Sequence, residues 1–257
     1  LLLNSKIQHS KNVAHGVGEF WGHKLDANGN LVWRRYFGGS NNDRAYGVVE
    51  ATDGGFLMIG NSESTDFDVT SSNGSYDFWA IRLDPEGNLL WEKSLGGSQI
   101  DIAYDVTATT DGNYLIVGDP RSMDGDVNML NGNADVWVVK LSDQGELLWE
   151  RSLGGTSFDT ARSITPTERG YAITGASRSS DGQVTQNYGQ NDIWIIQIDT
   201  TGNITSQVAM GGNGQDFGYA ISVSDDSLII AGETSSISGD LIATQGKLDA
   251  VLIKLSL

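Results

Sequence analysis

The sequence has no cysteine, only three prolines and no long apolar run. Without cysteine the chain can form neither a disulfide nor a thiolate zinc site, and it has no cysteine nucleophile. Because no run of about 18 apolar residues occurs, the sequence predicts no membrane-spanning helix. Basic residues are also scarce, with 16 Lys and Arg against 33 Asp and Glu and a net charge of −17. Nucleic-acid binding needs the opposite sign of charge, so we expect no nucleic-acid partner.

What the sequence has in abundance is glycine, arranged in a repeat of 57 or 58 residues. Four Gly-Gly pairs begin at Gly38, Gly96, Gly154 and Gly211. Two sets of tryptophans keep the same step: Trp21, Trp79, Trp137 and Trp194, and then Trp33, Trp91 and Trp149. Two columns of aspartate do so as well: Asp43, Asp101, Asp159 and Asp216, and then Asp77, Asp135, Asp192 and Asp249. Such self-similarity indicates an array of equivalent structural units, with boundaries near residues 38, 96, 154 and 211.

Each repeat contains four strand-like segments, at residues 101–110, 114–118, 135–141 and 146–153 in the second full copy. Turn signals such as Asp111-Gly112 separate them, and no segment has useful helical periodicity. Four antiparallel strands in nearly sixty residues describe a β-propeller blade. The sequence therefore predicts an all-β chain, a single propeller domain over residues 1–257. A β-solenoid is the alternative, but its coils are usually shorter.

The two ends of the chain match incomplete blades. Leu1-Leu2-Leu3 matches a second strand, and residues 250–257 match a third strand. About five blades are therefore visible, of which the outer two are incomplete. We expect either a piece of a longer propeller or a five-bladed ring with two short blades, and we favour the piece.

Blade geometry places the acidic residues on one face. The long loops between second and third strands (residues 62–77, 119–135, 176–192 and 233–249) share a face with the Gly-Gly loops. Together with Asp43, Asp101, Asp159 and Asp216 they hold 17 of the 33 acidic residues. The basic residues on this face are four: Arg44, Arg121, Arg178 and Lys247. Because loops on a rigid scaffold commonly carry binding sites, this predicts an acidic binding face. A merely solvated surface is the alternative.

Within these loops an Asp-x-Asp element recurs, carried by Asp66, Asp68, Asp124, Asp126 and Asp181. Oxygen ligands at alternate positions can chelate Ca²⁺, the one cofactor that the sequence suggests. The spacing is not that of an EF-hand, and the same carboxylates could instead accept backbone N–H bonds in turns. The two aspartate columns are expected to be structural, because a residue repeated in every blade is more often a loop clamp than a catalyst.

Catalysis has little support in the sequence. All three histidines, His9, His15 and His23, lie in the first 23 residues, and His15-Gly16 occupies a turn position. No Ser-His-Asp triad and no phosphate-binding loop is suggested. We therefore expect no enzyme, although a carboxylate pair in the central channel could serve a glycosidase. The tryptophans are expected to pack between blades, which leaves Tyr76 and Tyr188 as candidates for stacking on a sugar.

The motif D-x-W-x-x-K-L-x-x-x-G-x-L-x-W-x-x-x-x-G-G-S-x-x-D-x-A, with T-x-D-G-G and S-x-D-G-D-V, extends through the chain. It is carried by residues 77–103, 52–56 and 122–127 with small departures. It resembles the secreted β-propeller repeat proteins of the SBBP type, which are common in Bacteroidota. The resemblance implies a propeller at the bacterial surface or outer membrane, or outside the cell, and implies no defined activity.

Together these features predict a non-catalytic protein-interaction or scaffold module in a bacterial surface assembly, with a protein partner. A carbohydrate-binding adhesin that recognises a surface glycan, with calcium assisting, is the alternative. A glycan-active enzyme is the third possibility.

Overall fold

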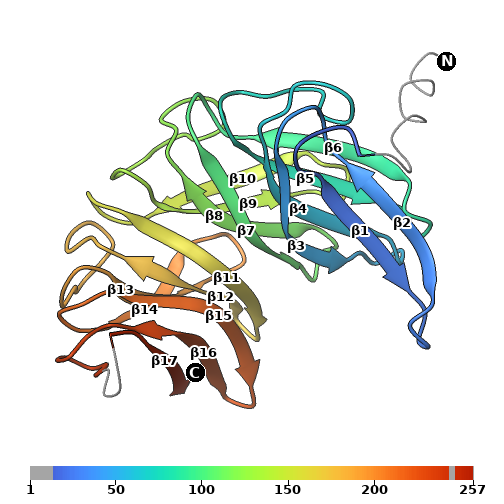
Figure 1. The fold of residues 1–257 in the computed structure, drawn as a ribbon. Coiled ribbons are helices and arrows are strands. Elements are labelled where there is room, and N and C mark those ends of the chain that lie inside the picture. Colours follow the sequence, from blue (N-terminus) through green and yellow to red (C-terminus); the bar gives the residue numbers. More distant parts are fainter. Residues whose placement is uncertain (1–13, 243–246, 257) are drawn as a thin grey trace. The chain divides into compact units, whose positions relative to one another are not determined.

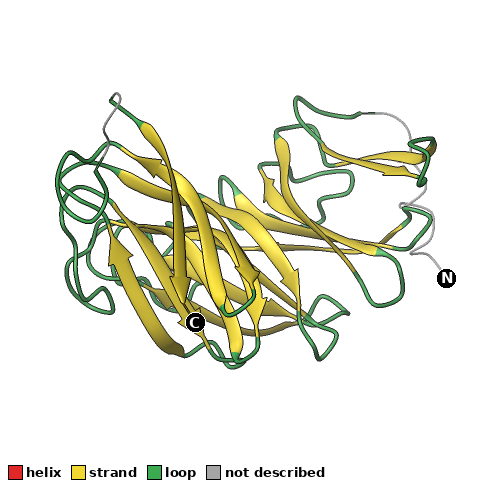
Figure 2. Ribbon diagram, turned by 90° about the horizontal axis from the view of Figure 1, so that it is seen from below, coloured by secondary structure: helices red, strands yellow, loops and turns green. Residues whose placement is uncertain are grey.

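The computed structural model describes residues 14–242 and 247–256, which form strands, turns and loops (Figures 1 and 2). No helix occurs in this part of the chain, so none is available to cross a membrane as a long apolar helix. The strand predicted at Leu1-Leu2-Leu3 lies outside the described residues. The strands are β1 Phe20–Leu25, β2 Leu31–Phe37, β3 Asp43–Glu50, β4 Phe56–Ser62, β5 Asp77–Leu83, β6 Leu89–Leu95, β7 Asp101–Ala108, β8 Tyr114–Pro120, β9 Val136–Leu141, β10 Leu147–Leu153, β11 Asp159–Thr167, β12 Gly170–Ser177, β13 Asp192–Ile198, β14 Ile204–Met210, β15 Asp216–Ser224, β16 Ser227–Thr234 and β17 Asp249–Ser256.

The strands form consecutive sheets along the chain (Figure 1). Three sheets have four strands in chain order, β3 to β6, β7 to β10 and β11 to β14. A two-stranded sheet, β1-β2, precedes them, and a three-stranded sheet, β15-β16-β17, follows. Neighbouring strands pair antiparallel, as in β4 with β5 and β12 with β13. The predicted all-β architecture of four-stranded antiparallel propeller blades is confirmed.

The hairpins between third and fourth strands share one turn chemistry. In the turn after β5, the N–H of Gly87 donates to the carbonyl of Asp84 at 3.0 Å, and the Asp84 carboxylate accepts the N–H of Asn88 at 2.7 Å. Gly87 has φ +78°, and Gly29, Gly145 and Gly202 repeat this conformation at φ +82°, +80° and +86°. Glycine adopts positive φ without steric cost, which explains why the turn recurs at this point.

The chain divides into two compact units. The first comprises Leu1–Tyr114, Ser122–Asn128 and Leu141–Leu148, and the second comprises Leu115–Arg121, Met129–Lys140 and Trp149–Leu257. One apolar cluster in the first unit gathers around Trp79, and the clusters of the second gather around Trp194 and Ile195. The middle strands β5, β9 and β12 are buried along their whole length, as expected for strands covered on both faces. The single domain over residues 1–257 stays a prediction.

Most of the tryptophans pack inside the blades. Trp79, Trp137 and Trp194 are buried, and their indole N–H groups donate to Glu92, Glu150 and Gln207 at 2.8, 2.7 and 2.7 Å. The second set packs differently: the indole N–H of Trp33 donates to the Pro85 carbonyl at 3.0 Å. The adjacent Gly87 lies flat on that ring, since a Cβ there would come within 2.9 Å of it.

Trp21 departs from the expected packing, because its side chain is 55% exposed. In the next copy Glu92 accepts the indole N–H, but in the copy of Trp21 the equivalent residue is Arg34. The Arg34 guanidinium lies over the Trp21 ring, 5.6 Å from its centroid. Repeat position alone therefore did not predict burial here.

Candidate functional site

In three blades the Gly-Gly loop contacts the long loop of the same blade. The first carboxylate of each Asp-x-Asp element accepts a backbone N–H from a Gly-Gly loop. Asp66 accepts from Ser40 at 2.7 Å, Asp124 from Ser98 at 2.7 Å and Asp181 from Thr156 at 2.8 Å. These bonds lower the pKa of Asp124 and Asp181. The exposed carboxylates therefore hold two loops together in each blade.

The side chain at the second aspartate position of these Asp-x-Asp elements accepts an N–H from the first glycine of the Gly-Gly pair. Asp68 accepts the N–H of Gly38 at 3.3 Å, and Asp126 accepts that of Gly96 at 3.2 Å. Gln183 replaces the aspartate in the next copy and accepts the N–H of Gly154 at 2.9 Å. In the described residues no group of three or more acidic or histidine side chains is arranged to hold a metal. The carboxylates make the backbone hydrogen bonds of the alternative arrangement, and calcium binding by these loops stays a prediction.

The calcium hypothesis can be tested by a thermal melt of the chain in EDTA and in millimolar Ca²⁺. We expect no shift of the melting temperature, because backbone N–H groups already occupy an oxygen of each carboxylate. A specific site would stabilise the fold by about 2.7 kcal/mol at a hundredfold excess over Kd. A rise that Asp66→Asn abolishes would contradict the expectation and assign calcium to these loops.

The first aspartate column is buried and fully engaged. Asp101 accepts the N–H of Gly97 at 2.8 Å, the Ser122 hydroxyl at 2.7 Å and the Ser122 N–H at 3.1 Å. The glycine N–H and the serine hydroxyl contacts recur at Asp43, Asp159 and Asp216. There the hydroxyls of Ser62, Ser177 and Thr234 take the place of the serine N–H as the third donor. The serines that donate the recurring hydroxyl hydrogen bond occupy one position of the repeat, which the sequence analysis missed. They are Ser64, Ser122, Ser179 and Ser236.

The second column stands beside the first at the Gly-Gly pairs. The N–H groups of Asn73, Asn131 and Tyr188 donate to Asp77, Asp135 and Asp192 at 2.6, 2.8 and 2.6 Å. Burial and the adjacent Asp101 raise the pKa of Asp77. Burial and the neighbouring Asp159 raise the pKa of Asp135 to about 6. Burial, with Asp216 and Asp240 nearby, raises the pKa of Asp192 to about 6 as well. Asp249, the last of the column, is half-buried.

Phe67 is the residue of this face that the sequence analysis overlooked. It lies between Asp66 and Asp68 with φ +54°, at a position where the other copies have Gly125, Gly182 and Gly239, all with positive φ. Its side chain is 60% exposed and stacks on the half-buried His15 ring, with centroids 4.4 Å apart. The available signal was a phenylalanine in a column of glycines.

The two tyrosines proposed to stack on a sugar lie in different units. Tyr76 is half-buried, and its carbonyl accepts the N–H of Asp101 at 2.7 Å. Tyr188 is exposed, and loss of hydration together with a hydrogen bond to Asp240 raises its pKa. That Tyr76 and Tyr188 contact a sugar ligand stays a prediction.

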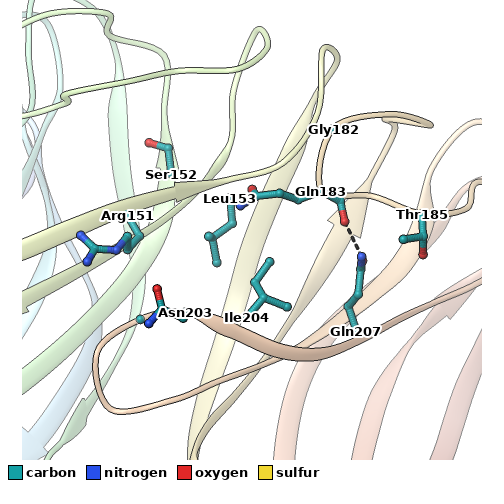
Figure 3. A pocket seen from close by; sticks show the side chains of 10 residues that line it. Arg151, Ser152, Leu153, Gly182, Gln183, Thr185, Asn203, Ile204 and Gln207 are labelled. Carbon is teal, nitrogen blue, oxygen red and sulfur yellow. Dashed lines mark hydrogen bonds between the residues drawn. The ribbon is translucent and has the colours of Figure 1, made fainter.

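A shallow pocket of about 500 Å³ opens in the second unit, between β10, β14 and the loop after β12 (Figure 3). The amide of Gln207 donates to the carbonyl of Gln183 across it (Figure 3). Its lining is Arg151, Ser152, Leu153, Gly182, Gln183, Thr185, Gly202, Asn203, Ile204 and Gln207. The previous copy has Asp126 and Glu150 in place of Gln183 and Gln207. The pocket is therefore lined by one cation and several amides and carries no carboxylate.

No protein-family model and no curated protein matches this chain. Among solved structures it is similar to a protein of unknown function from Bacteroides caccae, at 12% identity and TM-score 0.45, over 84% of this chain and 68% of that one. A Synechocystis apocarotenoid oxygenase variant has the same identity and TM-score, over 95% and 57%. A GH43 β-xylosidase/α-arabinofuranosidase from a compost metagenome has 12% identity and TM-score 0.43, over 80% and 68%. The chain spans 57% of the length of the oxygenase.

The prediction that the chain is not an enzyme is corrected by these comparisons, since two of the similar structures are enzymes. That prediction depended on the missing triad and phosphate loop. Catalysis by paired carboxylates or by a bound cofactor needs neither feature. The likeness itself assigns no activity to this chain.

Proposed function

We propose that this chain is a protein-interaction module of a bacterial surface assembly, and that it binds its partner through the acidic loop face. Phe67 is the observation that carries the proposal. Secretion and membership of the SBBP-type family are part of it, supported by the repeated motif of residues 77–103.

Phe67 stabilises the fold through its ring contact with His15, but it also destabilises it in two ways. A non-glycine residue at positive φ is strained by about 1 kcal/mol or more. An exposed phenyl ring also leaves most of its apolar surface in water. The other copies close the same loop with glycine and avoid both costs. A strained, exposed aromatic residue on a hydrogen-bonded loop has the properties of an interface anchor.

The surroundings of Phe67 indicate the chemistry of the partner. Asp66 is exposed beside it and Glu63 is half-exposed, and Met123 is an exposed apolar residue of the equivalent loop in the same unit. Apolar anchors with a charged rim are typical of protein interfaces. With a net charge of −17, the chain would attract a basic partner over long range.

Phe67→Gly tests the anchor directly. We expect the variant to lose salt-sensitive binding to an array of basic peptides that also contain aromatic or aliphatic residues. Its free energy of unfolding should change by less than about 1 kcal/mol, because relief of strain is opposed by the lost stacking on His15 and by the greater freedom of glycine in the unfolded chain. Binding is read by fluorescence of labelled protein and stability by denaturant unfolding.

Leu90→Ala is the matched control, because Leu90 is an exposed apolar residue on the outer strand β6. It should bind as the unchanged chain does. Equal binding by Phe67→Gly would contradict the proposal. Binding to a glycan array that survives Phe67→Gly and is lost in Asn203→Ala would instead favour the alternative function, with the pocket around Asn203 as the site.

A further inference from the structure

Each Gly-Gly pair is flanked by two carboxyl groups aimed at the same point. The distances are measured to the position that a Cβ on the first glycine would occupy. At Gly96 the nearest oxygens are Oδ2 of Asp101 at 2.4 Å and Oδ1 of Asp77 at 2.9 Å. At Gly154 they are Oδ2 of Asp159 at 2.5 Å and Oδ1 of Asp135 at 2.9 Å. Gly211 repeats this with Asp216 at 2.7 Å and Asp192 at 2.3 Å, and Gly38 with Asp43 and Glu19 at 2.4 and 3.1 Å.

The two members of a pair differ in their hydrogen bonds. The member that begins a first strand, such as Asp159, accepts the N–H of Gly155 and the hydroxyls of Ser177 and Ser179. The other member has one oxygen that is buried and has no hydrogen-bond partner. This oxygen is Oδ1 in Asp77, Asp135 and Asp192, whose side chains are almost fully buried.

The charged groups with the largest effect on the pKa of the unpartnered member are acidic. The charged group that acts on Asp77 is Asp101, the one that acts on Asp135 is Asp159, and those that act on Asp192 are Asp216 and Asp240. All of these are carboxylates. Two adjacent carboxylates cannot both stay ionised away from water without a large cost, and a shared proton removes that cost.

We propose that the pairs Asp77/Asp101, Asp135/Asp159 and Asp192/Asp216 are acid pairs, each of which holds one proton in the folded chain. The proton resides on the otherwise unpartnered Oδ1 of Asp77, Asp135 or Asp192, and the neighbouring carboxylate stabilises it. Loss of this proton places two negative charges at one Gly-Gly loop and weakens that junction. The loop face is then a pH-sensitive device, more tightly held under mildly acidic conditions than above neutrality.

The direction of the pH dependence follows from the raised pKa of about 6 for Asp135 and Asp192, against an ordinary value of 3.8. A carboxyl whose pKa is raised in the folded state contributes stability that is fully present below pH 3.8. That contribution is lost as the pH rises through about 6. Carboxylates with lowered pKa, such as Asp199, act in the opposite direction at lower pH. A variant that removes only the pairs separates the two effects.

The experiment compares the full chain with Asp135→Asn/Asp192→Asn by denaturant unfolding from pH 4.5 to pH 8. Asparagine imitates the protonated acid at every pH. The folding equilibrium constant of the unchanged chain should fall relative to the variant by about 30-fold for each pair over this range, given a pKa of about 6 in the folded chain and 3.8 in the unfolded chain. Asp199→Asn is the control, because it removes a carboxylate whose pKa is lowered and should leave the pH dependence above pH 4.5 unchanged.

Infrared spectroscopy in D₂O gives a second readout that does not depend on a variant folding. The C=O band of a protonated carboxylic acid should be present in the unchanged chain at pH 5 and disappear by pH 8. Absence of that band at pH 5, or parallel pH profiles of chain and variant, would overturn the proposal. It would also fail if Ca²⁺ or K⁺ at pH 8 restored the stability seen at pH 5, because a cation would then occupy the pair.

Discussion

Asp101→Ala is expected to lower the free energy of unfolding by about 3 to 5 kcal/mol, which is much of the stability of an ordinary domain. The carboxylate is buried and accepts three hydrogen bonds, from the Gly97 N–H and from the N–H and hydroxyl of Ser122. Each buried donor left without an acceptor costs about 1 to 3 kcal/mol. Ser122 follows β8 and Gly97 follows β6, so the substitution loosens two loops at once.

Denaturant unfolding measures this loss, and Asp124→Ala is the matched control from the same loop face. Asp124 is exposed and accepts the N–H of Ser98 at 2.7 Å, a donor that water can satisfy in its place. We expect the control to lose about 1 kcal/mol or less. Equal losses from the two substitutions would show that the buried column has no special part in holding the Gly-Gly loops.

Ser122→Ala adds a test of the mechanism. If Asp101 acts through Ser122, the double variant should be less destabilised than the sum of the two single variants. Additive losses would mean that the carboxylate stabilises the loop through Gly97 alone.

The strands could be predicted from the sequence because every copy of the repeat carries the same local signals. The segment at Tyr114 is apolar and short, it begins after the Asp111-Gly112 turn, and the structure forms β8 there. Turns such as the one at Gly87 depend on residues four apart, so they too are legible in the sequence. Each unit of a repeat protein contacts mainly its neighbours, which is why local patterns determine so much of this fold.

The missed features depend on contacts between residues distant in the sequence. Ser64 donates to Asp43 across 21 residues, and Trp21 is exposed although Trp79, Trp137 and Trp194 at the same repeat position are buried. Phe67 is a different case, because the other copies have glycine at its repeat position and the departure itself is informative. Residues that break a rule which their own repeat obeys are where functional roles are expected.

Arg82→Met is expected to lower the free energy of unfolding by about 2 to 3 kcal/mol. The Arg82 guanidinium is 2% exposed and donates to Asp53 at 2.7 Å, to Asp143 at 3.2 Å and to the Leu83 carbonyl at 2.5 Å. The Tyr114 hydroxyl donates to the same Asp143 oxygen at 2.8 Å. Breaking a fully buried ion pair costs about 3 to 5 kcal/mol. The loss here is smaller because Asp53 and Asp143 are 52% and 41% exposed and can be rehydrated.

The pH dependence of this loss distinguishes electrostatics from packing, since methionine keeps most of the apolar volume. The Gly55 N–H and the Arg82 side chain lower the pKa of Asp53 below 3.8. A lowered pKa contributes stability above the ordinary value, and that contribution is lost as the pH falls through the folded-state value. The difference between the chain and Arg82→Met should therefore shrink as the pH falls from 7 to 3. Lys254→Met, at an exposed position on β17, should show little loss at either pH. If the Arg82→Met loss is the same at both pH values, packing of the arginine stem, and not its two carboxylate partners, is what stabilises this part of the first unit.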